Sequence, residues 1–384
     1  MWRNIASNAL TLFIVVLVVL VGMIAWGKQQ WTGPGPLAEA MCLRVESGSN
    51  FARLSRDLAE AGAISNPSIF RIGVQYSGKA QDLKAGAFLV RPGTSMREIL
   101  DIVTRGGAST CGSEIVLRIG VARNEVQVRE LDPATERFVT RAAFPLDQAE
   151  IPGDYKRLRE EPGTRYRIAL AEGTTVWQVV EALRQADFLS GEVAKLPPEG
   201  MIAPDSYEVK AGAERGALVA RMQAAQAAIL AEAWANRADG LPYDSPEEAL
   251  VMASIVEKET GIAEERPLVA SVFVNRLRRG MNLQTDPAVI YGITKGRGGL
   301  GRGLRQSELR ADTPYNTYVN PGLPPTPIAI PGKDAIEAAL HPADTDYIFF
   351  VADGSGGHAF AATLEEHNRN VAKWRAIEAG RAGQ

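Results

Sequence analysis

The sequence predicts an α+β protein with a single N-terminal transmembrane helix, a small α+β module carrying an inserted β-rich segment, and a C-terminal α+β domain. Three features predict this class: an apolar run opens the chain, short strand-turn-helix patterns recur in its first half, and longer helices followed by many turns fill its second half. With 384 residues, 46% of them hydrophobic, the chain is long enough for two or three domains with packed cores.

The composition excludes several classes of function. A net charge of −3 without any Lys/Arg-rich run argues against nucleic acid as the main partner. The three histidines, His341, His358 and His367, lack HExxH spacing, so we expect neither a metal centre nor a cofactor. Cys42 and Cys111 are too few for a zinc cluster. A single disulfide outside the cytoplasm and two unrelated free thiols both remain open.

Residues 5–26 form the apolar run, which is long enough to cross a bilayer. Trp2, Trp26 and Trp31 stand where an aromatic belt would lie. A cleaved signal peptide is the alternative, but the small-x-small site at 38–40 comes too far after the run. We therefore expect an anchor that stays attached.

The flanking charges predict the orientation of this anchor. Arg3 and the terminal amine precede the run and Lys28 follows it, which weakly favours an N-terminus inside the cell. We expect a cytoplasmic tail at 1–4, a linker over 27–42, and the remaining chain on the periplasmic or extracytoplasmic side of the cytoplasmic (inner) membrane.

A pattern centred on glycine recurs three times after the linker. Gly48, Gly93 and Gly173 are each followed by apolar residues at the third, sixth and tenth positions. These residues are Phe51, Leu54 and Leu58, then Met96, Ile99 and Val103, then Val176, Val179 and Leu183. The unit is typical of a strand, a tight turn and an amphipathic helix, and it predicts a small module over 43–190.

Residues 112–163 are interpreted as an insertion in this module. Apolar residues alternate along 115–121, and Val126 and Val128 continue the alternation, which predicts a β-hairpin. A charged stretch follows to about Thr164, in which we identify no chemistry.

A helix is predicted to begin at Ser245 and Pro246, which suit the N-cap and the first helical position. Its apolar stripe comprises Val251, Met252, Ile255 and Val256. Glu259 falls near the middle of the stripe, whereas Glu257 points the other way. A carboxyl group on such a stripe resists ionisation, which a general acid for glycoside cleavage requires.

Two further helices are expected to surround this one. An Ala-rich helix over about 215–236 serves as scaffold, and another runs from about 266 to 279, with Gly280 as its stop. Arg266 or Arg276 on the latter is a candidate ion-pair partner for Glu259, and the end of the Glu259 helix is a candidate for fraying. Periodicity alone leaves these alternatives open.

Polar side chains among turns follow. They are Gln284, Thr285, Asp286, Tyr291, Tyr315, Asn316 and Tyr318, before a Pro-rich loop at 322–327. Such groups on rigid turns can bind sugar hydroxyls and acetamides, although each alone is more often a turn former. His358 follows a predicted hairpin turn at 354–357, and we expect it to hydrogen-bond substrate beside the cleft rather than to act as the catalytic base.

Together these motifs resemble the endolytic murein transglycosylases, the MltG or YceG-like family. The matching segments are Ala253-Ser-Ile-Val-Glu-Lys-Glu-Thr, Ala270-Ser-Val-Phe-Val-Asn-Arg-Leu, Leu283-Gln-Thr-Asp-Pro, Tyr315-Asn-Thr-Tyr, Gly322-Leu-Pro-Pro and Phe350-Val-Ala-Asp-Gly-Ser-Gly-Gly-His-Ala-Phe. The resemblance covers about 199–374, and more weakly 43–106 and 166–190, which resemble a LysM-like glycan-binding module. It leaves out the insertion, and it implies a catalytic domain over 191–384.

The resemblance implies that Glu259, the second Glu of Glu-Lys-Glu, is the catalytic acid and base of an endolytic peptidoglycan lytic transglycosylase. It would cleave the bond between N-acetylmuramic acid and N-acetylglucosamine in nascent strands, leave 1,6-anhydro ends and so terminate elongation. Gln284, Asp286 and Asn316 are candidates to position the substrate. Peptidoglycan synthases of the elongation or division machinery are the expected protein partners.

Two other functions fit the same residues. An ordinary muramidase would use Asp286 or Glu257 to activate water. A non-enzymatic, membrane-anchored scaffold would bind glycan through the repeats and hold a synthase complex through the C-terminal half.

Overall fold

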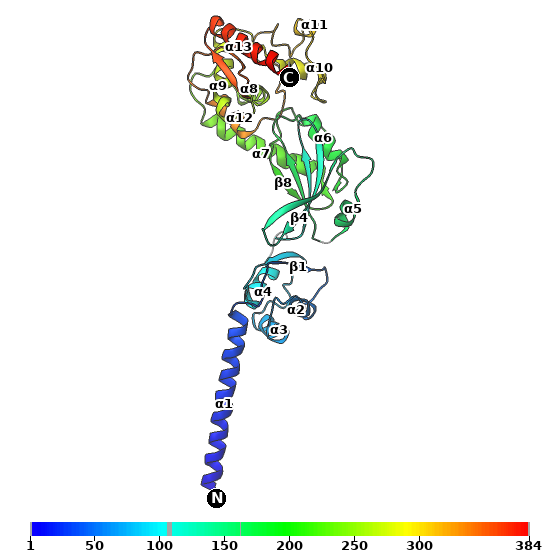
Figure 1. The fold of residues 1–384 in the computed structure, drawn as a ribbon, viewed down its shortest axis with the longest axis vertical. Coiled ribbons are helices and arrows are strands. Elements are labelled where there is room, and N and C mark those ends of the chain that lie inside the picture. Colours follow the sequence, from blue (N-terminus) through cyan, green and yellow to red (C-terminus); the bar gives the residue numbers. More distant parts are fainter. Residues whose placement is uncertain (1, 106–109, 162, 383–384) are drawn as a thin grey trace. The chain divides into compact units, whose positions relative to one another are not determined.

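The computed structural model describes residues 2–105, 110–161 and 163–382 and has the mixed α+β architecture that the sequence predicts (Figure 1). The chain divides into two compact units. The first unit comprises Met1–Ile115, Gln127–Ala143 and Glu150–Tyr166. The second comprises Val116–Val126, Phe144–Ala149 and Arg167–Gln384.

The chain begins with one long apolar helix, α1 (Trp2–Thr32). Among the described residues, its segment Leu10–Thr32 is the one stretch long and apolar enough to cross a membrane, which fits a single-pass anchor. The helix continues beyond residue 26, where we expected the apolar span to end. Near its end, the Trp31 ring packs against Phe70 with ring centroids 6.0 Å apart, so the last turns belong to the core of the first unit.

The first two glycine-centred repeats lie in the first unit, and both have the predicted form. Strand β1 (Met41–Val45) leads to helices α2 (Phe51–Glu60) and α3 (Pro67–Tyr76), and β2 (Gly86–Val90) leads to α4 (Met96–Thr104). The two strands pair antiparallel. Gly48 and Gly93 have φ values of 79° and 71°, which glycine adopts at little steric cost. Their apolar followers are buried in one core.

Cys42 and Cys111 form a disulfide, with Cα atoms 5.6 Å apart. This decides between the two alternatives that the sequence left open. The bridge joins β1 to the segment that precedes the insertion, and Cys111 packs with Ala87 and Leu89 in a small buried cluster. The first unit is therefore cross-linked beside its own sheet.

The insertion contains more structure than the sequence suggested. The predicted hairpin appears as neighbouring strands β3 (Ser113–Ile119) and β4 (Asn124–Asp132). Beyond it lie β5 (Arg137–Pro145) and α5 (Gly153–Glu160), which we did not predict. The sheet has the order β5-β4-β3-β6-β8, with β6 (Arg165–Leu170) and β8 (Ser206–Val209). Because β5 is an edge strand with mostly exposed side chains, it lacks an apolar alternation.

The third repeat belongs to the second unit. Gly173, with a φ of 74°, follows β6, and α6 (Val176–Gln185) begins three residues later. Thr175 and Gln178 form a capping box at the start of this helix. Next come the short parallel pair β7 (Leu189–Ser190) and β9 (Ala213–Glu214), then the long helix α7 (Arg215–Ala235).

Helix α8 (Pro246–Glu259) is the centre of the second unit, and it contacts α7, α9 (Arg266–Arg278), α10 (Asp286–Thr294) and α12 (Lys333–Leu340) (Figure 1). All residues from Ala249 to Val256 are buried, so the helix is covered all round rather than along one stripe. The remaining elements are the 3-10 helix η1 (Ala263–Glu265), α11 (Gln306–Leu309), the antiparallel pair β10 (Phe349–Ala352) and β11 (His358–Ala361), and α13 (Leu364–Ala382).

Candidate active site

Glu259 is the last residue of α8, and its half-buried side chain contacts Thr285, which follows α9 in the sequence. The Thr285 hydroxyl donates a hydrogen bond of 2.5 Å to its Oε1 atom. Burial raises the pKa of Glu259; the charge of Asp286 adds to this rise, while the Thr285 hydrogen bond and the charges of His358 and Arg276 oppose it. Because Glu259 lies at the C-terminal, negative end of the helix dipole, its ionised form is disfavoured further. Glu259 therefore holds a proton toward higher pH than an ordinary glutamate.

The alternatives for Glu259 that periodicity left open do not match the structure. The helix extends through Glu259, and the Thr260 N–H still bonds to the Val256 carbonyl, so the end is not frayed. Arg266 pairs instead with Glu172 and Asp334, each at 3.6 Å. Arg276 donates to the carbonyls of Ile348 and Leu283. Neither arginine takes Glu259 as an ion-pair partner.

The loop that carries Thr285 is fixed by a second threonine. The Thr285 N–H donates to Thr317 Oγ1 at 3.0 Å, and the Gln284 N–H donates to the Thr317 carbonyl at 3.0 Å. Gln284 is exposed and has a φ of 53°, a conformation that side-chain-bearing residues rarely adopt. The predicted residues Gln284 and Thr285 thus stand together beside Glu259, the first facing solvent and the second buried.

Asp286 and Tyr318 continue this wall. Asp286 is the exposed first residue of α10, and its Oδ1 atom accepts a hydrogen bond of 2.7 Å from the Tyr318 hydroxyl. Burial, followed by the Asp286 contact, raises the pKa of Tyr318, so the phenol remains protonated. The structure therefore brings both of these predicted residues to the Glu259 site.

Tyr291 and Tyr315 form a separate pair, with ring centroids 5.1 Å apart. The Tyr291 hydroxyl donates to Glu199 Oε2 at 3.1 Å, and the Tyr315 hydroxyl is 2.8 Å from Thr326 Oγ1. Glu199, whose pKa is raised by burial, was not among our candidates. It borders a cavity of about 650 Å³ with the Pro-rich loop at 322–327. No contact joins these two tyrosines to Glu259 among the interactions of the described residues.

Asn316 has a different environment from the other candidates. It is completely buried, and its Nδ2 atom donates to the carbonyls of Glu308, Leu309 and Ala311. Its Oδ1 atom accepts the Tyr318 N–H at 3.0 Å. Because the side-chain amide of Asn316 already makes these hydrogen bonds within the loop, the geometry favours the turn-forming role over the substrate contact that we also considered.

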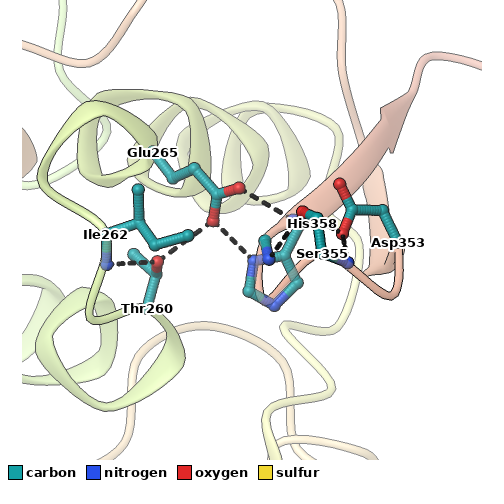
Figure 2. A network of polar contacts seen from close by, with 7 residues as sticks. Thr260, Ile262, Glu265, Asp353, Ser355 and His358 are labelled. Carbon is teal, nitrogen blue, oxygen red and sulfur yellow. Dashed lines mark hydrogen bonds and ion pairs between the residues drawn. The ribbon is translucent and has the colours of Figure 1, made fainter.

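His358 starts β11 and is held by Glu265, a residue that the sequence analysis missed (Figure 2). Glu265 Oε1 accepts the His358 N–H at 2.7 Å, and Glu265 Oε2 lies 2.7 Å from Nδ1 of the ring. The predicted turn at 354–357 joins β10 to β11 as expected. Glu265 carried no signal in the sequence, since it adjoins another glutamate in a short segment without periodicity.

Glu257 corrects one expectation. We expected it to point away from the covered face of the helix, but α12 and the segment before it cover that side too. Its Oε2 atom accepts the Gly332 N–H at 3.1 Å, and burial raises its pKa to about 7. The nearby charge of Glu172 adds to the rise, whereas Arg266 and Lys258 oppose it. Two carboxyl groups on α8, rather than one, are therefore poorly hydrated.

Glu259 can donate and accept a proton, and the side chains beside it are polar and partly exposed. Over residues 2–105, 110–161 and 163–382, no group of three or more His, Cys, Asp or Glu side chains is arranged to hold a metal ion. The residues that the structure places together are Glu259, Gln284, Thr285, Asp286, Tyr318 and, through its charge, His358.

Known proteins resemble this chain over most of its length. The endolytic murein transglycosylase of Streptococcus pneumoniae serotype 2 is 28% identical over 357 residues, covering 86% of this chain and 57% of the relative. The chain thus spans little more than half of that relative's length. The endolytic murein transglycosylase of Bacillus subtilis is 28% identical over 332 residues, covering 86% of this chain and 84% of the relative. A crystal structure of a putative YceG-like protein from Listeria monocytogenes has 24% identity and a TM-score of 0.47, covering 86% of this chain and 98% of that one.

The model of the YceG-like family matches residues 145–373, which include α8, the Thr285 loop and the hairpin that carries His358. This match covers more than half of the chain. The protein therefore belongs to the YceG-like family.

Proposed function

We propose that this protein is an endolytic peptidoglycan lytic transglycosylase in which Glu259 is both general acid and general base. The observation that carries the proposal is the position of the Glu259 carboxyl at the end of α8, where burial raises its pKa and the Thr285 hydroxyl bonds to one of its oxygens. The names of the relatives from Streptococcus pneumoniae and Bacillus subtilis support murein as the substrate.

The reaction needs one carboxyl group. Protonated Glu259 gives its proton to the oxygen that links C1 of N-acetylmuramic acid to N-acetylglucosamine, and the C1–O bond breaks. The 2-acetamido group of the substrate assists at C1. The resulting carboxylate takes the proton of the muramoyl 6-hydroxyl, whose oxygen bonds to C1 and closes the 1,6-anhydro ring. Glu259 ends protonated, and no water is consumed.

The residues around Glu259 are suited to these two proton transfers. The Thr285 hydroxyl fixes one carboxyl oxygen and stabilises the anion that forms after proton donation. The exposed side chains of Gln284 and Asp286 are available to the sugar, and Tyr318 holds Asp286 in place. These residues position the acetamido and 6-hydroxyl groups in our proposal.

A muramidase is the second candidate, because one observation favours it. Asp286 is exposed and lies close enough for its charge to raise the pKa of Glu259, so it is placed to activate water against C1. Glu257 is less suited to that role, because its carboxyl binds the Gly332 N–H on the other side of α8.

Digestion of purified glycan strands by the full chain distinguishes the two reactions. We expect products whose muramoyl ends are one water lighter than reducing ends. Products that carry only reducing ends would establish hydrolysis, and intact strands would contradict both activities.

We also propose that the chain after α1 lies outside the cytoplasm and that residues 43–190 include a LysM-like glycan-binding module, with residues 191–384 as the catalytic domain. The Cys42–Cys111 disulfide supports this side of the membrane, since disulfides persist in oxidising compartments. Strands β1 and β2, with α2 and α3 between them, support the module. Cleavage of nascent strands beside peptidoglycan synthases would terminate their elongation.

A reporter fused to the C-terminus tests this topology. We expect activity from a reporter that functions only after export. Activity from a reporter that functions only in the cytoplasm would contradict both the orientation and the substrate.

A further inference from the structure

A hydrogen-bonded network begins one residue beyond Glu259 and ends at His358 (Figure 2). Thr260 is buried, and its hydroxyl donates to Glu265 Oε2 at 3.1 Å while accepting the Ile262 N–H at 3.1 Å. The two oxygens of Glu265 then receive the backbone N–H and the ring of His358, each at 2.7 Å. The carboxylate thus ties the C-terminal end of α8 to the first residue of β11.

The contacts of Glu265 determine which ring nitrogen of His358 carries the proton. Burial alone would raise the pKa of Glu265, but hydrogen bonds from His358 and Thr260 lower it, so this carboxyl is ionised and only accepts. The ring nitrogen that faces it, Nδ1, must therefore be the donor. In a neutral imidazole the other nitrogen, Nε2, is then an acceptor.

The packing leaves little freedom in this arrangement. A Cβ atom on Gly357 would come within 2.5 Å of Glu265 Oε1 and 3.3 Å of the Ile262 side chain. The His358 ring packs edge-on against Phe350, with centroids 5.3 Å apart. Its side chain is nevertheless 19% exposed, and no hydrogen bond to Nε2 occurs among the described residues.

We propose that Glu265 is a positioning residue that holds His358 as the Nδ1–H tautomer, so that Nε2 accepts a hydrogen bond from a hydroxyl or amide N–H of the glycan bound at Glu259. The inference rests on the proposed function, since it assigns a contact to the same substrate. The ring lies near Glu259, since a proton on it would lower the pKa of that carboxyl, and the proposed acceptor at Nε2 belongs to the neutral ring. In metal sites, carboxylates that fix the tautomer and orientation of a histidine in this way contribute about 10–100-fold to affinity or activity, and we expect an effect of similar size here.

Replacement of Glu265 by Gln gives a defined prediction for the tautomer. The backbone N–H of His358 cannot change from donor to acceptor, so the amide oxygen of the new side chain will face it. The amide NH2 then faces Nδ1, which must become an acceptor and release its proton to Nε2. The variant therefore presents a donor to the glycan where the native protein presents an acceptor.

The tautomer can be measured in the full chain in detergent micelles, by nuclear magnetic resonance after labelling of histidine with ¹⁵N. The chain has three histidines, and His358→Gln identifies the signal of His358. His341 is an internal reference, because its Nε2 atom is 2.8 Å from the Asn236 carbonyl and must carry a proton. Glu264→Gln is the matched control, since Glu264 is the exposed neighbour of Glu265.

We expect a proton on Nδ1 of His358 in the native chain and in Glu264→Gln, and on Nε2 in Glu265→Gln. We also expect kcat/KM on glycan strands to fall about 10–100-fold in Glu265→Gln and to stay within about twofold in Glu264→Gln.

Two different results would overturn different statements. A native chain that cleaves glycan, together with an unchanged tautomer or unchanged turnover in Glu265→Gln, overturns the role of Glu265 alone. A native chain that leaves glycan intact contradicts the proposed function, and with it the substrate contact, even if the tautomer changes as expected.

Discussion

The two sides of the last turn of α8 carry one carboxyl group each, and burial raises the pKa of both. They differ in their partners. Glu257 accepts a backbone N–H from Gly332, beside the charged side chains of Glu172, Arg266 and Lys258. Within the described part of the chain, the one hydrogen bond that Glu259 accepts on its side chain comes from the Thr285 hydroxyl, and the neighbouring side chains of Gln284 and Asp286 are exposed. Burial alone therefore does not distinguish a catalytic acid from a structural carboxyl group. The distinguishing features are that a substrate can reach the carboxyl group and that its hydrogen-bond donor can remain in place when the proton leaves.

The largest effect is expected from Glu259→Gln. The amide keeps the size of the side chain and can still accept from Thr285, but it cannot deliver a proton, so turnover should fall about 1,000-fold or more. The measurement is the release of soluble fragments from purified peptidoglycan. Turnover that falls less than about tenfold would move the catalytic role away from this side of the helix.

On the other side, Glu257→Gln should change stability rather than activity. The folded state binds the Glu257 proton up to a pH of about 7 instead of the ordinary 4.5, so the native chain loses stability as pH rises between these values. The variant has no such loss and should be more stable by about 2 kcal/mol at pH 8, after allowance for partial exposure. Near pH 4 the two should agree.

Unfolding of the full chain in detergent, followed by circular dichroism at both pH values, tests this expectation. A variant that gains no stability at pH 8 would show that the Glu257 carboxyl is better hydrated than its burial indicates.

Thr285→Val sharpens the comparison on the Glu259 side. The Thr285 hydroxyl stabilises the anionic form, so its removal should raise the pKa of Glu259 further. We expect the alkaline limb of the kcat/KM profile to move to higher pH, because the acid form persists longer, and the maximum to fall about tenfold. A limb that moves to lower pH would contradict the assignment of that limb to Glu259.

The smallest effect is expected from Gly332→Ala. A Cβ atom at this position would lie 1.9 Å from Glu172 Oε1, but Glu172 is 43% exposed and can turn away. The change weakens one ion pair with Arg266 and should cost less than about 1 kcal/mol, without affecting turnover. A large loss of activity would show that the two sides of α8 are coupled.

The local elements were largely predictable because they follow from short-range rules. The tight turns at the three repeat glycines, the start of α8 at Ser245 and Pro246, and the limits of α7 and α9 all appear in the structure close to where the sequence indicates them. Each depends on residues within a few positions of one another.

The missed features depend on contacts between distant residues. Glu265 meets His358 across 93 positions, and Glu257 meets Gly332 across 75. Neither contact has a periodicity that one segment could reveal. Asn316 shows that a local rule can also mislead. It lies in a predicted loop, yet it is completely buried, and its amide donates to carbonyl groups of the same loop. Tertiary packing decides which polar side chains of a turn face solvent.

The most direct test compares Glu257→Gln and Glu259→Gln on the same purified glycan strands, with 1,6-anhydro ends scored by mass. The two variants remove equivalent groups from opposite sides of one helical turn, so differences in folding or membrane insertion are minimised. We predict that anhydro ends persist in Glu257→Gln and disappear in Glu259→Gln. Loss of these ends in Glu257→Gln, with their retention in Glu259→Gln, would contradict the assignment of catalysis to Glu259.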